Sequence, residues 1–161
     1  MFDKFGEFNS VEELNLAASG FVKEADFESV YALAEENGLQ KEDADDYLDG
    51  MTEELATLPM AAQGRLDIEE KEAKNPMEKM ALAVIILMLR GMCEDAEMQA
   101  AVLQKGKRVK EIFEGMKKGA EKHKNGSTGI SCGTDRQLRG IIKAYYLGTK
   151  AEFEKAIESL Y

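Results

Sequence analysis

The sequence predicts an all-α protein. Apolar residues recur every three or four positions through most of the 161-residue chain, which is the spacing of an amphipathic helix. Several of these segments begin with a Ser, Thr, Asp or Asn that can cap a helix, and no segment keeps the alternation of a strand. We therefore expect a small acidic N-terminal helical module, followed by a helical bundle around one strongly apolar central helix.

The N-terminal module is expected to span residues 1–58. Ser10 and Glu13 have the spacing of a capping box, and Asp26 can cap a second helix. Gly38 and Gly50 are placed to end helices in the left-handed conformation. Three short helices are therefore predicted, at residues 11–22, 27–37 and 41–49.

Residues 59–75 are predicted to form a linker. Pro59 interrupts the helical pattern of residues 53–62. The segment that follows is polar and charged, and it ends in Asn75 and Pro76, a pair suited to cap and begin the next helix.

The second module is expected to span residues 76–161. Its most apolar stretch, MALAVIILML at residues 80–89, is apolar on nearly every helical face and should lie at the centre of a bundle. These ten residues rise roughly 15 Å as a helix, about half a bilayer, so a buried core helix is favoured over a membrane span. Further helices are expected from about Glu94, over 109–120, after a cap at Thr134 or Asp135, and after a cap at Thr149.

The charge is unevenly divided along the chain. The 21 basic and 31 acidic side chains give a formal net charge of −10, which argues against a simple DNA binder. Residues 1–75 hold 6 basic and 20 acidic side chains, while residues 76–161 hold 15 basic and 11 acidic ones. This split indicates either two regions with different partners, or two halves that attract each other within one fold or across a dimer.

Signals for an enzyme are weak. The single histidine, His123, lies in a basic stretch typical of a solvated surface, and Cys132 lies in a glycine-rich loop with nothing to orient a Cys–His pair. The acidic run at 43–49 fails the calcium-loop template because Tyr47 stands where an oxygen ligand is required. We therefore predict no catalytic residue, no metal site and no cofactor. Two cysteines and no apolar leader favour a reducing cytoplasm.

A basic segment at residues 105–124 is one candidate binding surface. On a helix its cations surround an apolar stripe, which is the pattern of either a solvated amphipathic helix or a contact with nucleic acid or an acidic partner. The candidate residues are Lys105, Lys107, Arg108, Lys110, Lys117 and Lys118.

A dense group of carboxylates in the N-terminal module is the other candidate. Negative charge at spacings comparable to phosphates would be attracted to a positively charged nucleic-acid channel, although many small proteins use acidity only to stay soluble. The candidate residues are Glu35, Glu36, Glu42, Asp43, Asp45, Asp46, Asp49, Glu53 and Glu54.

The second module resembles the PcfK-like proteins of bacterial plasmids and integrative elements. The resemblance lies in EDAEMQAAVLQKGKRVKEIFEGMKKGAEKHK at 94–124 and IIKAYYLG at 141–148. The segment LAEENGLQKEDADDYLDGMTEEL at 33–55 is similar to an N-terminal extension found on a subset of such proteins. The residues that stand where the family pattern places them are Lys105, Lys107, Phe113, Tyr145 and Tyr146.

The resemblance implies a protein of a mobile genetic element, phage or plasmid, in the cytoplasm of a bacterial host cell. Some PcfK-like proteins are anti-CRISPR inhibitors of Cas9, which implies Cas9 or the Cas9–guide RNA complex as a partner. The resemblance does not fix the contact surface, and we expect the acidic face because Cas9 holds its nucleic acids in a positively charged channel. The alternative is an accessory protein of conjugation or element maintenance that binds DNA or a protein partner through residues 105–124. No membrane contact is expected. A homodimer through the helix of Tyr145 and Tyr146, or by head-to-tail charge attraction, is also open.

Overall fold

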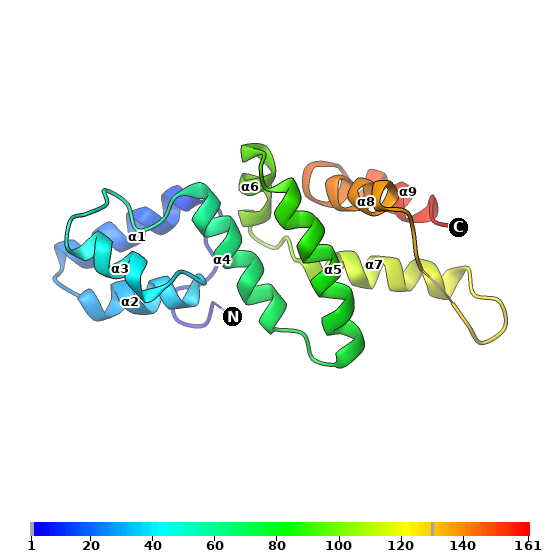
Figure 1. The fold of residues 1–161 in the computed structure, drawn as a ribbon, viewed down its shortest axis with the longest axis horizontal. Coiled ribbons are helices and arrows are strands. Elements are labelled where there is room, and N and C mark those ends of the chain that lie inside the picture. The colour runs from blue at the N-terminus through cyan, green and yellow to red at the C-terminus, as the bar shows by residue number, and fades with distance from the viewer. Residues whose placement is uncertain (1, 130) are drawn as a thin grey trace. The chain divides into compact units, whose positions relative to one another are not determined.

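The computed structural model describes residues 2–129 and 131–161, and within them it contains nine α-helices and no strand (Figure 1). The all-α prediction is confirmed. None of the described helices is both long and apolar enough to cross a membrane. The helices are α1 (Val11–Lys23), α2 (Phe27–Glu36), α3 (Lys41–Leu48), α4 (Leu58–Lys71), α5 (Pro76–Met92), α6 (Ala96–Leu103), α7 (Val109–Lys122), α8 (Asp135–Leu147) and α9 (Lys150–Glu158).

The chain divides into two compact units that are not consecutive in sequence. Unit 1 comprises Met1–Glu72 and Cys93–Gly106, and unit 2 comprises Ala73–Met92 and Lys107–Tyr161. The helix α6, which the sequence placed in the second module, packs against α4 and belongs to unit 1. The units therefore differ from the predicted ranges 1–58 and 76–161.

The predicted linker at 59–75 is mostly the helix α4. Pro59 lies in the first turn, where its missing N–H is not needed, so it begins the helix instead of interrupting it. The sequence reading missed the helix because two of its buried positions carry charged side chains, Arg65 and Glu69, which pair with each other.

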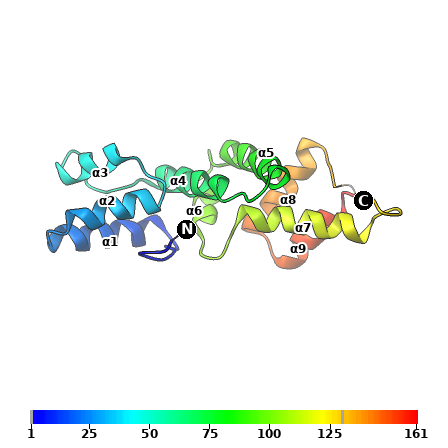
Figure 2. The same cartoon turned by 90° about the horizontal axis from the view of Figure 1, so that it is seen from below.

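Unit 1 is built on local signals that the sequence reading identified. Ser10 and Asp26 accept hydrogen bonds from the backbone at the starts of α1 and α2, and Gly38 and Gly50 adopt positive φ after α2 and α3. Figure 2 shows α2 between α1 and α3, and these contacts bury the core. The core includes Val11, Leu14, Ala18, Val30, Leu33, Ala34, Ala44, Leu55, Ala61 and Leu103.

One close backbone approach fixes the position of α4 in unit 1. A Cβ on Gly64 would lie 2.3 Å from the Asn37 carbonyl oxygen, and one on Gly38 would lie 2.3 Å from the Gly64 carbonyl oxygen. Only glycine fits at both positions, because neither backbone can move without displacing a helix.

Unit 2 packs one face of α5 against α7 and α8, and α9 against α7 and α8. Asn75 caps α5, and Thr149 begins α9 with a complete capping box, as the sequence predicted. Of the two predicted caps of α8, Thr134 and Asp135, it is Thr134 that begins the helix, also with a complete capping box. The buried side chains include Leu82, Ile85, Ile86, Leu89, Val109, Ile112, Ile141, Ile142, Tyr145, Tyr146 and Ile157.

Two expectations for unit 2 are wrong. The helix α5 is not enclosed on all sides, because Met77, Met80, Val84 and Leu87 are 50–75% exposed. The helix of Tyr145 and Tyr146 does not present these rings for a symmetric interface, since both side chains are buried at 7% and 2% exposure. Their hydrophobic surface is used inside unit 2.

Candidate acidic binding face

The nine predicted carboxylates all lie in unit 1, on the end of α2, on α3 and on the loop between α3 and α4. The helix α3 is short and turns Ala44 inward, where it is fully buried. Its opposite side carries Glu42, Asp46 and Asp49, which are exposed. The sequence KEDADDYL thus forms an amphipathic helix whose polar side is almost entirely carboxylate.

Three of the nine carboxylates hold the fold together. Glu36 accepts hydrogen bonds from the backbone N–H groups of Lys4 and Phe5 at 2.8 and 3.1 Å. Asp43 accepts from the Gln40 backbone N–H at 2.8 Å and completes the capping box of α3. These carboxylates are committed to internal contacts.

Asp45 is the third internal carboxylate. Its Oδ1 accepts a 2.6 Å hydrogen bond from the Tyr31 hydroxyl, which ties α3 to α2, and its Oδ2 lies 3.8 Å from Lys41 Nζ. The hydrogen bond to Asp45 raises the pKa of Tyr31, because it holds the phenol proton next to a negative charge.

The other six are exposed, and in the described part of the chain their carboxylates make no hydrogen bond or ion pair with the protein. We call them the open carboxylates: Glu35, Glu42, Asp46, Asp49, Glu53 and Glu54.

Four acidic side chains surround one depression of about 220 Å³ on unit 1. Asp43 and Asp46 come from α3, and Glu53 and Glu54 come from the loop that follows. Leu55, Met60, Thr52 and Thr57 complete the lining. The sequence reading missed these apolar members, because nothing local shows that Met60 of α4 returns to the acidic loop.

This lining suits the side chain of a lysine or arginine. An aliphatic stem can lie on Leu55 and Met60 while its cationic head meets the carboxylates. Across residues 2–129 and 131–161, no group of three or more Asp, Glu, His or Cys is arranged to hold a metal ion. The depression thus offers apolar side chains and carboxylates to a basic side chain.

Two of the predicted carboxylates border a different depression. Glu35 and Glu36 line a wider depression of about 400 Å³ together with Phe2, Asp3, Lys4, Ala32 and Ile68. The acidic face thus has two parts, and only the part around α3 and the 51–57 loop collects several open carboxylates.

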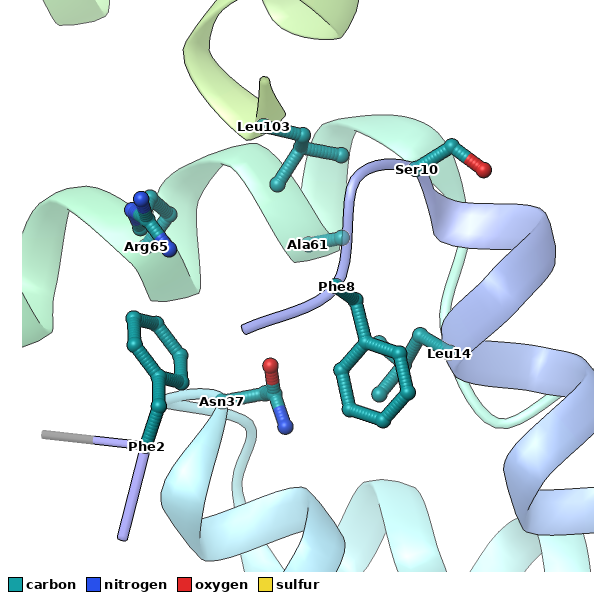
Figure 3. A pocket seen from close by; sticks show the side chains of 8 residues that line it. All are labelled: Phe2, Phe8, Ser10, Leu14, Asn37, Ala61, Arg65 and Leu103. Atoms are coloured by element: carbon teal, nitrogen blue, oxygen red, sulfur yellow. The ribbon is translucent and has the colours of Figure 1, made fainter. Parts of the chain in front are cut away.

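A separate, small cavity lies inside unit 1, and Figure 3 shows the eight side chains that line it. Its volume is about 20 Å³, which is room for one water molecule. Arg65, 3% exposed, borders it and pairs with Glu69 at 2.9 Å and with Glu7, while the Phe2 ring lies 4.6 Å from the guanidinium carbon. This buried ion cluster joins the N-terminal segment to α4 and stabilises the fold. The cavity beside it is too small for a ligand larger than water.

The six basic candidates differ in the contacts that they make. Lys105 lies in unit 1, whereas the other five lie in unit 2. Lys107 Nζ donates to the Tyr145 carbonyl at 2.6 Å and lies over the Tyr145 ring. Lys110 pairs with the buried Glu78 at 2.8 Å. Of the six candidates, Lys117 and Lys118 are adjacent exposed cations on α7.

The backbone of the basic residue Arg108 also makes a contact within unit 2. The Arg108 N–H donates to the Tyr145 hydroxyl at 2.8 Å, and that hydroxyl donates to Glu111 at 2.8 Å. Lys107 and Arg108 therefore attach the 107–111 segment to α8, and Lys110 attaches it to α5 through Glu78.

The side chain of His123 makes its contacts within unit 2. Its Nε2 lies 2.8 Å from a Glu158 oxygen, and its ring stacks on Tyr161 at 4.5 Å between centroids. Lys122 and His123 together lower the pKa of Glu158, with the Lys122 hydrogen bond the larger cause. The side chain is thus a surface contact between α7 and the C-terminal end of unit 2.

No family model, curated protein or solved structure matches the chain at a significant level. The resemblance to PcfK-like proteins therefore stays a prediction from the residues quoted above.

Proposed function

We propose that this protein acts without chemistry of its own, as an anti-CRISPR inhibitor that binds a type II Cas9 through the acidic face of unit 1. The observation that carries the proposal is the set of open carboxylates around α3 and the 51–57 loop. Five of the six lie there, beside a depression with an apolar floor. A surface of this kind is complementary to clustered arginine and lysine side chains.

The charge of the whole unit supports the same partner. Unit 1 holds 6 basic and 23 acidic side chains, a net of −17, while unit 2 holds 15 basic and 8 acidic ones, a net of +7. A strongly negative surface speeds association with a positive nucleic-acid channel and competes with phosphates there. Cas9 holds its guide–target heteroduplex in such a channel and reads the adjacent motif with arginines.

A second candidate function rests on Lys117 and Lys118, the exposed cation pair on α7. Under this hypothesis the protein is an accessory factor of conjugation or mobile-element maintenance and binds DNA or an acidic partner. It has less support, because Lys107 and Lys110 are held by contacts within unit 2. Measurable DNA retention at low salt that is lost on Lys117→Gln and Lys118→Gln would favour it.

The first experiment is a cleavage assay with order of addition. Purified protein is titrated against several type II-A Cas9–guide complexes, before or after the target DNA. The proposal predicts inhibition when the protein is added first and little inhibition when DNA is already bound, because both occupy the same basic surface. Inhibition in either order would place the block at nuclease activation. No inhibition of any complex would contradict the proposal.

The second experiment reverses the three open carboxylates that line the depression and one more that follows α3: Asp46→Lys, Glu53→Lys and Glu54→Lys, with Asp49→Lys. Asp43 and Asp45 are left intact because they stabilise α3. The matched control reverses four exposed carboxylates elsewhere in unit 1, Glu24, Glu28, Glu94 and Glu97, so that both variants change the net charge equally. We expect at least about 100-fold weaker inhibition from the first variant and a much smaller change from the control. Equal losses would mean that only net charge matters.

A further inference from the structure

The helix α5 has two apolar faces, and unit 2 covers only one of them. Leu82, Ile85, Ile86 and Leu89 are buried at 0–6% exposure against α7 and α8. On the other side Met77, Met80 and Leu87 are 71–75% exposed. A soluble helix at a surface usually presents polar side chains there, so this second face is unusual.

The exposed residues follow the spacing of a helix–helix seam. Positions 77, 80, 84 and 87 are separated by three, four and three residues, which is the a/d pattern of a heptad repeat. A stripe with this spacing is the surface along which two helices pack in a coiled-coil seam. The shape of the surface therefore selects a helix as its occupant.

The seam is also free of charge. Ala81 and Ala83 border it and permit a close approach of backbones, while Lys79 and Arg90 lie off the stripe. A partner helix must therefore carry apolar side chains in four successive layers and small side chains on either side of them. The face of α5 itself meets both requirements.

We propose that this face binds the same face of a second copy of the chain, as an antiparallel α5–α5 pair. The two-fold axis crosses the seam at the level of residue 82 along the helix. In this register Met77 packs on Leu87 of the second copy and Met80 on Val84, so each exposed side chain has an exposed partner. Antiparallel helices also align their dipoles favourably. The interface lies wholly within unit 2 and is separate from the acidic face of unit 1.

The available area sets the strength of the dimer. The four side chains expose on the order of 500 Å² of apolar surface per copy, somewhat below the roughly 800 Å² per partner of a standard stable interface. We therefore expect a reversible dimer with a dissociation constant in the range of about 1–100 µM. Such a dimer would carry two copies of the acidic face.

The test compares two leucines of equal exposure. Leu87 in the seam is 71% exposed, and Leu16 on α1 of unit 1 is 72% exposed. Sedimentation equilibrium of the full chain is measured from about 5 to 200 µM for the wild type, Leu87→Glu and the control Leu16→Glu. We expect concentration-dependent dimers for the wild type and the control, and at least about 30-fold weaker association for Leu87→Glu, because two carboxylates would enter an apolar seam.

Three results would overturn the proposal. They are a wild type that stays monomeric at the highest concentration, dimers that Leu87→Glu leaves intact, and equal dissociation by Leu16→Glu. Since Leu87 packs little within its own chain, Leu87→Glu should fold, and circular dichroism checks this. Met80→Glu, at a 75% exposed position, is the second seam variant and must weaken association as well.

Disulfide trapping tests the antiparallel register in a Cys132→Ser background, since Cys93 is buried and Cys132 is exposed. Ala83→Cys lies close to the proposed axis and should form a cross-linked dimer under mild oxidation. Val84→Cys should cross-link efficiently only if the helices run parallel. Efficient trapping by Val84→Cys and none by Ala83→Cys would overturn the antiparallel arrangement.

Discussion

The two units use their charged side chains differently. In unit 2, cations pair with carboxylates of the same unit, as Lys110 does with Glu78 and Lys122 with Glu158. In unit 1 the acidic side chains outnumber the basic ones by 17. Among the described residues, the ion pair at the α3 carboxylates is Lys41 with Asp45, at 3.8 Å. Charge in unit 2 therefore contributes to its fold, whereas much of the charge in unit 1 is left facing solvent.

The surplus of negative charge favours unit 1 as the unit that binds a partner. Leaving like charges close together opposes folding, because the carboxylates repel one another. Unit 1 tolerates this repulsion on one side of α3 while its core is well packed. An uncompensated surface on a rigid support is what electrostatic capture of a basic partner requires.

The largest expected loss of stability comes from breaking the buried ion cluster of unit 1. Arg65→Ala would remove the cation that pairs with the buried carboxylate of Glu69, 4% exposed, and with Glu7, and we expect a loss of about 3–5 kcal/mol. The matched change in unit 2 is Arg139→Ala, which breaks an exposed i,i+4 pair with Asp135 and should cost less than about 0.5 kcal/mol. Urea unfolding followed by circular dichroism measures both, and similar losses would contradict this account.

The next prediction contrasts two buried glycines. Gly64→Ala would press a methyl group onto the Asn37 carbonyl of a neighbouring backbone, and we expect a loss of about 2–3 kcal/mol. In unit 2, Gly119→Ala would meet the side chains of Ile157 and Tyr161, which can shift, so its loss should be smaller. Hydrogen exchange measured by mass spectrometry should show lost protection in α2 and α4 for Gly64→Ala. Protection unchanged there would contradict the tight fit.

Removing the buried ion pair of unit 2 should make its stability less sensitive to acid. The hydrogen bond from Lys110 lowers the pKa of Glu78, with a smaller contribution from the Lys74 backbone N–H. Because the folded pKa lies below the usual value of 4.5, the pair stabilises the fold at neutral pH and this stability is lost as the pH falls from 4.5 through the lower folded pKa.

Lys110→Met should therefore be less stable than the wild type at pH 7, and the difference should shrink in acid. Thermal unfolding between pH 7 and pH 3 measures this difference. A difference that stays constant over the range would show that the ion pair does not contribute.

The smallest expected effects are gains in stability. Gly20 in α1 and Gly140 in α8 have no atom within 4 Å of an added Cβ. Replacing either by Ala should stabilise its unit by about 0.5–1 kcal/mol, since glycine is the poorer helix former. Because one site lies in each unit, the pair of variants shows whether the units respond to equal helix stabilisation equally. A loss of stability at either site would contradict the open surroundings.

Much of the fold follows from local signals in the sequence. Caps such as Asp26, Thr134 and Thr149, and the stops at Gly38 and Gly50, fix helix ends through interactions within four or five residues. The sequence could not show that Arg65 and Glu69 occupy buried positions of α4, because a charged residue at a core position looks like a surface residue until its partner is known. This is why α4 was predicted as a linker.

Long-range packing explains the other differences. The pairing of α6 with α4 joins segments about 40 residues apart in the chain, and no local pattern indicates it. The apolar run of α5 did not show which side would be covered, since both sides carry similar residues. For the acidic face, the sequence predicted the carboxylates, but the internal contacts that separate Asp43 and Asp45 from Asp46 and Asp49 depend on Gln40 and Tyr31.

The most direct measurement uses one Cas9 inhibition assay to compare two variants, each with five charged side chains of one unit replaced by uncharged ones. The unit 1 variant carries Glu42→Gln, Asp46→Asn, Asp49→Asn, Glu53→Gln and Glu54→Gln. The unit 2 variant carries Lys117→Gln, Lys118→Gln, Lys124→Gln, Lys143→Gln and Lys155→Gln, all at exposed positions. The account predicts that the first variant needs at least about 100-fold more protein for half-inhibition, with a shallower salt dependence, and that the second changes less than about threefold. Loss of inhibition in the second variant with the first unaffected would contradict it.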